Sequence, residues 1–131
     1  MSRTNDLDSI AMPLARLLGI EIVDAAPDRV VARLAVRDEL CTAGGILHGG
    51  AVMTLGDTAG ALGAFLNLAE GAHTTTIESK TNFLGSAPAG STVTATATPI
   101  HVGRRSSVWQ TRITNDAGKL LALVTQTQLV I

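Results

Sequence analysis

The sequence predicts an α+β domain in which one long helix packs on an antiparallel sheet. Three observations indicate this: one long helical segment, about six strand-like runs around it, and short connections that are rich in turn formers. Short connections favour antiparallel neighbours, because parallel strands need long crossovers. The 131 residues are enough for one domain with a real core and few for two, so we expect a single domain over residues 1–131.

A short helix and two strands are expected first. The helix is predicted over residues 8–18, where aliphatic residues recur at helical intervals and Gly19 would end it. Pro13 fits only near the first turn of such a helix. Two runs rich in β-branched residues, 20–25 and 29–38, follow as strands, with the turn-forming "APD" between them.

The long helix is expected from about residue 49 to 68, with four strands after it. At 100° per residue its aliphatic residues form one face, which is the natural side to lie on the sheet. The residues of that face are Val52, Leu55, Ala59, Leu62 and Leu66. The four later strands are expected at residues 74–84, 92–102, 106–115 and 120–131.

Composition excludes several classes of partner and location. Ten Lys and Arg against 11 Asp and Glu give a formal charge of -1, so we expect no nucleic acid and no anionic membrane surface as partner. Asp57 interrupts the best apolar run, which argues against a membrane span, and the N-terminus lacks the plan of a secretory signal. The single cysteine, Cys41, excludes an internal disulfide, and we expect a cytoplasmic protein.

The second face of the long helix carries a carboxylate among small residues. Its members are Gly50, Met53, Thr54, Asp57, Gly60, Ala61 and Ala64. A solvated helix face would carry Lys and Glu, but Asp57 is the only such charge between His48 and Glu70. We therefore expect this face to be covered by another backbone or a slender ligand. A covered carboxylate is costly unless it is paired or takes part in chemistry.

The start of the same helix is expected to attract a carbonyl oxygen. Gly49 and Gly50 permit close approach of a substrate, and the free N–H groups with the helix dipole favour developing negative charge. Asp57 lies two turns further on, roughly 12 Å along the axis, which is too far to serve the same carbonyl. Two antiparallel copies of the helix would bring Asp57 of one copy near His48 and Gly49 of the other.

These residues resemble those of the hotdog-fold thioesterases, in particular the phenylacetate-pathway type. The resemblance rests on "GILHGG", read as G-x-x-H-G-G, with an acid seven residues after it, and extends over residues 15–131. It implies a long helix wrapped by a curved antiparallel sheet, and at least a homodimer, commonly a homotetramer of two dimers. It also implies hydrolysis of acyl-CoA thioesters at the dimer interface without a metal or cofactor.

The resemblance implies roles for residues of this chain. By position, Asp57 matches the catalytic carboxylate, which acts as general base or nucleophile, and Gly49 matches the residue whose N–H polarises the thioester carbonyl. His48 matches the histidine beside it. The helper hydroxyl on the strand after the helix falls at Thr76, or at Thr75 if the loop differs by one residue.

One position departs from the family pattern. Many relatives have Asn or Gln six residues before the histidine, where this chain has Thr42. A threonine hydroxyl donates one hydrogen bond and reaches less far than an amide. Thr42 then serves with a water, or activity is low, or the preferred substrate differs.

The turn "HVGRRSS" is the one compact basic segment. In the family this turn lies near the nucleotide end of CoA, so Arg104 and Arg105 are candidates to bind its phosphates, although simple solvation explains them equally well. No base is identifiable beside Cys41, so we expect a structural thiol.

Taken together, the residues predict an acyl-CoA thioesterase. One alternative is a hydratase or dehydratase of acyl thioesters on the same fold. That class usually has the acid before the histidine, whereas here His48 precedes Asp57. The other alternative is an acyl-CoA binding module without turnover, which the departure at Thr42 keeps open.

Overall fold

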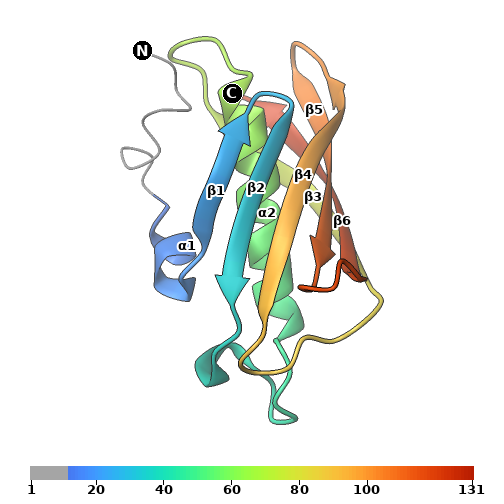
Figure 1. Ribbon diagram of the computed structural model, residues 1–131. Coiled ribbons are helices and arrows are strands. Elements are labelled where there is room, and N and C mark those ends of the chain that lie inside the picture. The colour runs from blue at the N-terminus through green and yellow to red at the C-terminus, as the bar shows by residue number, and fades with distance from the viewer. Residues whose placement is uncertain (1–11) are drawn as a thin grey trace.

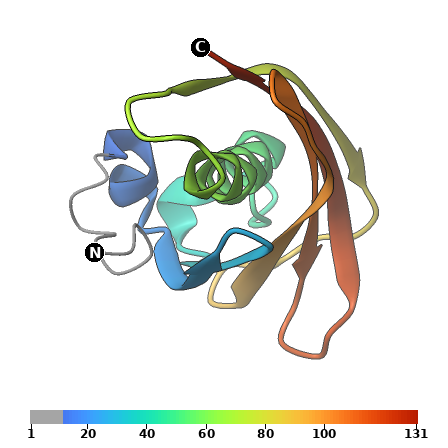
Figure 2. The ribbon, with the colours of Figure 1, turned by 90° about the horizontal axis from the view of Figure 1, so that it is seen from above.

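The computed structural model describes residues 12–131 and has a long helix lying inside a strongly curved sheet (Figures 1 and 2). The helix expected from residue 8 begins at Pro13, whose ring suits the first helical position, and residues 8–11 lie outside the described part. The helical elements are α1 (Pro13–Leu18), the 3₁₀ turn η3 (Asp38–Leu40) and α2 (Gly49–Leu66). The strands are β1 (Glu21–Ala26), β2 (Arg29–Ala35), β3 (Thr74–Phe83), β4 (Thr92–Val102), β5 (Ser106–Thr114) and β6 (Leu120–Val130).

The six strands form one antiparallel sheet in the order β1-β2-β4-β5-β6-β3. The α+β class, the long helix and the antiparallel pairing predicted from the sequence are confirmed. Hairpins connect β1 to β2, β4 to β5 and β5 to β6, as their short turns require. The first strand after α2, β3, pairs with the last strand, β6, and forms one edge of the sheet.

Glycines in α2 allow the sheet to approach the helix backbone. A Cβ atom at position 63 would lie 2.5 Å from the ring of Trp109, which is fully buried, so only glycine fits there. The same close packing recurs at two more turns of the helix. The pairs are Gly56 with Val124, Gly60 with Gln126 and Gly63 with Trp109.

One part of the expected helix face is wrong. The sequence places Gly60 and Ala64 on a face open to another backbone, but both are buried within their own chain, Gly60 against Gln126 of β6. The reason is curvature: a sheet that curls around a helix covers more than the single apolar stripe of a helical wheel (Figure 2). Met53 remains exposed and Asp57 half-buried, so the uncovered strip of α2 is narrower than the sequence suggested.

Candidate active site

The first turn of α2 leaves one backbone donor unused. His48 caps the helix, and its Nδ1 accepts the N–H of Gly50 at 2.8 Å. The carbonyl of His48 accepts the N–H of Ala51 at 2.9 Å. No described residue accepts a hydrogen bond from the N–H of Gly49, which is therefore the donor available at the helix start.

The cap also determines the hydrogen bonding of the two residues beside Gly49, which are Gly50 and His48. The N–H of Gly50, which was expected to face a substrate, is already bonded to the cap. Since Nδ1 of His48 is an acceptor, the neutral ring carries its proton on Nε2. The His48 side chain is exposed and presents that N–H away from the helix cap.

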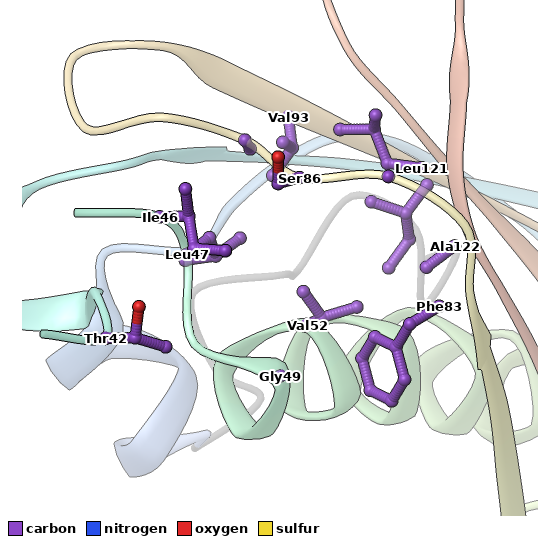
Figure 3. A pocket seen from close by; sticks show the side chains of 13 residues that line it. Thr42, Ile46, Leu47, Gly49, Val52, Phe83, Ser86, Val93, Leu121 and Ala122 are labelled. Carbon is purple, nitrogen blue, oxygen red and sulfur yellow. The ribbon is translucent and has the colours of Figure 1, made fainter. Parts of the chain in front are cut away.

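An apolar cavity of about 280 Å³ opens at the helix start (Figure 3). Gly49 and Thr42 both line it, so the structure brings together two of the residues expected at the carbonyl. The Oγ1 of Thr42 accepts the N–H of Gly44 at 3.2 Å, which leaves the hydroxyl hydrogen free to donate. The other side chains shown around the cavity are mainly aliphatic or aromatic, among them Ile46, Leu47, Val52, Phe83, Val93 and Leu121.

Asp57 lies in the middle of α2, with one carboxylate oxygen bound by the sheet. Its Oδ1 accepts the hydroxyl of Thr76 at 2.6 Å and the amide Nε2 of Gln126 at 3.0 Å. Thr75 is exposed, so Thr76 is the residue of that pair that meets the carboxylate. A register shift in β3 directly after Thr76 interrupts the alternation, so the half-buried positions are Thr74 and Thr76 before it and Ser79 and Thr81 after it.

Sequence reasoning missed two glutamines at this site. Gln126 and Gln128 on β6 are 0% and 1% exposed, and Gln128 Oε1 lies 2.6 Å from the Thr76 hydroxyl. A signal was present: alternation along β6 places both on the inward face with Val124, where an aliphatic residue is the norm. A polar residue at a core position of a strand indicates a hydrogen-bond partner on the facing helix.

The two arginines lie elsewhere in the protomer. Arg104 and Arg105 are exposed in the turn between β4 and β5, and neither forms an ion pair with any residue of the described part. Arg104 lines a second cavity of about 240 Å³ with Ala64 and Asn67, near the C-terminal end of α2. Within one chain, the basic turn and Gly49 are thus associated with opposite ends of the helix.

Two further features concern the remaining candidates. The Cys41 thiol donates to the carbonyl of Arg37 at 3.4 Å, which agrees with a structural thiol. Across residues 12–131, no helix has the length and apolar character needed to cross a membrane.

Comparison with known proteins places this arrangement in a family. The model of the thioesterase superfamily matches residues 44–122, which hold the helix start, Asp57 and Thr76. A 1,4-dihydroxy-2-naphthoyl-CoA hydrolase of Listeria monocytogenes is 36% identical over 112 residues, 86% of this chain and 90% of that protein.

Solved structures agree with this assignment. A thioesterase of Haemophilus influenzae superposes with a TM-score of 0.87 at 35% identity, covering 97% of this chain and 87% of that chain. The PaaI protein of E. coli, from the phenylacetic acid degradation operon, gives a TM-score of 0.85 at 28% identity over 92% and 85% of the two chains. The chain therefore belongs to the thioesterase superfamily, has its hotdog fold and is a thioester hydrolase.

Proposed function

We propose that the protein hydrolyses acyl-CoA or aryl-CoA thioesters at sites shared by two copies of the chain. The N–H of Gly49 in one copy polarises the thioester carbonyl. Asp57 of the second copy either activates a water molecule for attack on the carbonyl carbon or attacks that carbon itself. As general base, Asp57 takes a proton from water while the water oxygen attacks. The C–S bond then breaks, and CoA leaves as a thiolate that takes up a proton. As nucleophile, Asp57 forms an anhydride that water opens to the same products.

The observation that carries the proposal is the half-buried Asp57 carboxylate, bound on one oxygen by neutral donors only. Thr76 and Gln126 contact Oδ1, and no Lys, Arg or His of the described residues forms an ion pair with this carboxylate. A structural carboxylate in such a place would be expected to have a cationic partner. A catalytic one needs an oxygen left open, and no described residue donates to Oδ2.

Two copies are proposed because, within one copy, the N–H of Gly49 and the carboxylate of Asp57 lie too far apart to act on the same thioester. Gly49 and Asp57 occupy the same helix, two turns apart, roughly 12 Å along its axis. Met53, one turn before Asp57 on α2, is 38% exposed and lies on the strip of the helix that the sheet leaves uncovered. A second helix packed antiparallel across this strip would cover Met53 and bring its own Gly49 toward Asp57.

The cavity beside Gly49 supports a hydrocarbon or aromatic acyl group. Its volume of about 280 Å³ and its aliphatic walls suit an apolar group of modest size. The Listeria relative is named for an aromatic CoA thioester, so aryl substrates are tested beside straight chains. Because antiparallel pairing reverses the second helix, the basic turn of one copy comes to the side of the other copy's Gly49. Arg104 and Arg105 are proposed there as contacts to the CoA phosphates.

The test is thiol release from a panel of straight-chain and aryl acyl-CoAs, each matched by the same acyl group on a pantetheine thiol. We expect turnover with at least one acyl class. The double variant Arg104→Ala/Arg105→Ala should raise KM for the CoA ester much more than for its pantetheine counterpart. Equal effects on the two series would remove the arginine assignment. No turnover across the panel would contradict the proposed substrate class.

A further inference from the structure

A buried polar chain lies behind Asp57, between α2 and the inner face of the sheet. The Nε2 of Gln126 lies 3.0 Å from Asp57 Oδ1 and 2.9 Å from Oε1 of Gln128. The Nε2 of Gln128 continues the chain by donating to the hydroxyl of Thr74 at 3.0 Å. Both amides are buried, where polar groups are costly unless hydrogen-bonded, so each link affects how the next one is oriented.

The carboxylate sets the direction of this chain. An ionised carboxylate only accepts hydrogen bonds, so Gln126 must present its NH₂ group to Asp57 and turn its oxygen away. The second hydrogen of that NH₂ group then requires an acceptor, which fixes Gln128 with Oε1 toward Gln126 and its own NH₂ group toward Thr74. The Thr76 hydroxyl lies 2.6 Å from both Asp57 Oδ1 and Gln128 Oε1 and has one hydrogen to donate, for which the charged carboxylate is the stronger acceptor.

In this orientation one polar atom of Gln126 is left without a hydrogen bond. Its Oε1 is buried and has no hydrogen-bond partner among the described residues. The oxygen lies against α2 at Gly60, where an added Cβ would overlap it. An unpaired buried acceptor destabilises a fold, and an aliphatic side chain of equal length would avoid the loss. The glutamine keeps this unpaired oxygen while its Nε2 donates to Asp57 and Gln128.

We propose that Gln126 is a positioning residue for the thioesterase reaction. Together with Thr76 it holds Oδ1 of Asp57, which leaves Oδ2 as the oxygen that activates water or attacks the thioester. The proposal rests on the proposed function of Asp57. It adds that the reacting oxygen is selected from within the same protomer by an amide on β6, through the glycine at position 60 that makes room for it.

The first test is steady-state kinetics and thermal unfolding of Gln126→Met, which keeps length and removes the donor. We expect kcat to fall by roughly 10- to 100-fold, the scale for misplacing a reacting group, with KM nearly unchanged. The variant should remain folded, with a melting temperature above the assay temperature. The matched control is Thr111→Val, because Thr111 on β5 is also fully buried with an unpartnered hydroxyl but does not contact Asp57. Its kcat should not change. A folded Gln126→Met protein with parental kcat would overturn the proposal.

A second measurement does not depend on how Gln126→Met folds. In the ¹⁵N-labelled parent, the side-chain amide resonances of Gln126 should move when Asp57→Asn removes the charge. Those of Gln110, which is only half-buried and does not contact Asp57, should stay in place. Unmoved Gln126 resonances would overturn the proposal. Failure of the proposed function looks different: the parent would turn over no thioester, or Asp57→Asn would be as active as the parent.

Discussion

Asp57 is bound by two donors of different strength and from different strands. The Thr76 hydroxyl on β3 lies at 2.6 Å and the Gln126 amide on β6 at 3.0 Å, and both meet the same oxygen. Hydrogen bonds to a charged acceptor are stronger than those between neutral groups. Two of them on one oxygen therefore restrict rotation of the carboxylate about its Cβ–Cγ bond.

Removal of the Thr76 hydroxyl should lower turnover. Thr76→Val keeps the shape of the side chain and deletes the donor, so we expect kcat to fall about 10-fold, the lower value for a hydrogen bond to a charged group. Thr76→Ser keeps the hydroxyl and should retain most of the activity. Thiol-release kinetics of both variants make the comparison. If the valine and serine variants were equally active, the hydroxyl would have no role in turnover.

At this scale the sequence indicates some members of the proposed site and misses others for physical reasons. Asp57 could be identified because a charge amid small and apolar residues is costly without a purpose. Thr76 followed from the family resemblance, and Thr75 stayed open because the length of the loop before the strand is not fixed by the sequence. Gln126 was missed because its partner is 69 positions away in sequence. Side-chain pairs between a helix and a distant strand depend on register that composition does not encode.

Among the elements, α2 holds both residues proposed for the chemistry, Gly49 and Asp57. Its first turn has three N–H groups with different fates, and only that of Gly49 has no acceptor among residues 12–131. The extent of this helix could be predicted from its apolar period and its glycines. Which glycines face the sheet could not, because that depends on how far the sheet curves around the helix. Gly56, Gly60 and Gly63 all face large side chains of β5 and β6.

The N–H of Gly49 can be removed with little change to the helix. Gly49→Pro places proline at the first helical position, where it is tolerated, and His48 already has the ψ of 137° that a residue before proline adopts. We expect kcat to fall about 100-fold, as for loss of one oxyanion donor. Gly49→Ala is the control, since its Cβ meets the same Phe83 ring at 3.2 Å but keeps the N–H. Equal kinetics for the two variants would refute the role of this donor.

At the level of the whole molecule, the order of elements and the antiparallel sheet followed from the sequence. Turn-rich connections fix neighbours locally, and the single long helix had one sheet to pack on. The proposed dimer rests on other features: the separation of Gly49 and Asp57 along α2, the exposed Met53 one turn before Asp57, and the edge strand β3.

The shared site predicts that two inactive variants restore each other. We expect Asp57→Asn and Gly49→Pro, co-expressed with different tags, to form mixed dimers in which one of the two sites is intact. A statistical mixture should then recover about a quarter of the parental activity. Tandem-purified mixed dimers, each with one intact site of two, should have about half of the parental activity, and this is the measurement. Mixed dimers that form but stay inactive, or an active monomer in sedimentation at micromolar concentration, would contradict the shared site.

The most direct test of the account is the turnover of Asp57→Asn. An amide has nearly the shape of the carboxylate and keeps hydrogen-bonding groups, but it cannot accept a proton from water or form an anhydride at neutral pH. We predict that kcat falls by at least about 100-fold, the low end for general base catalysis, while substrate binding, melting temperature and assembly stay close to the parent. A variant that folds and assembles like the parent and retains most of its turnover would contradict the assignment of Asp57 as the catalytic carboxylate.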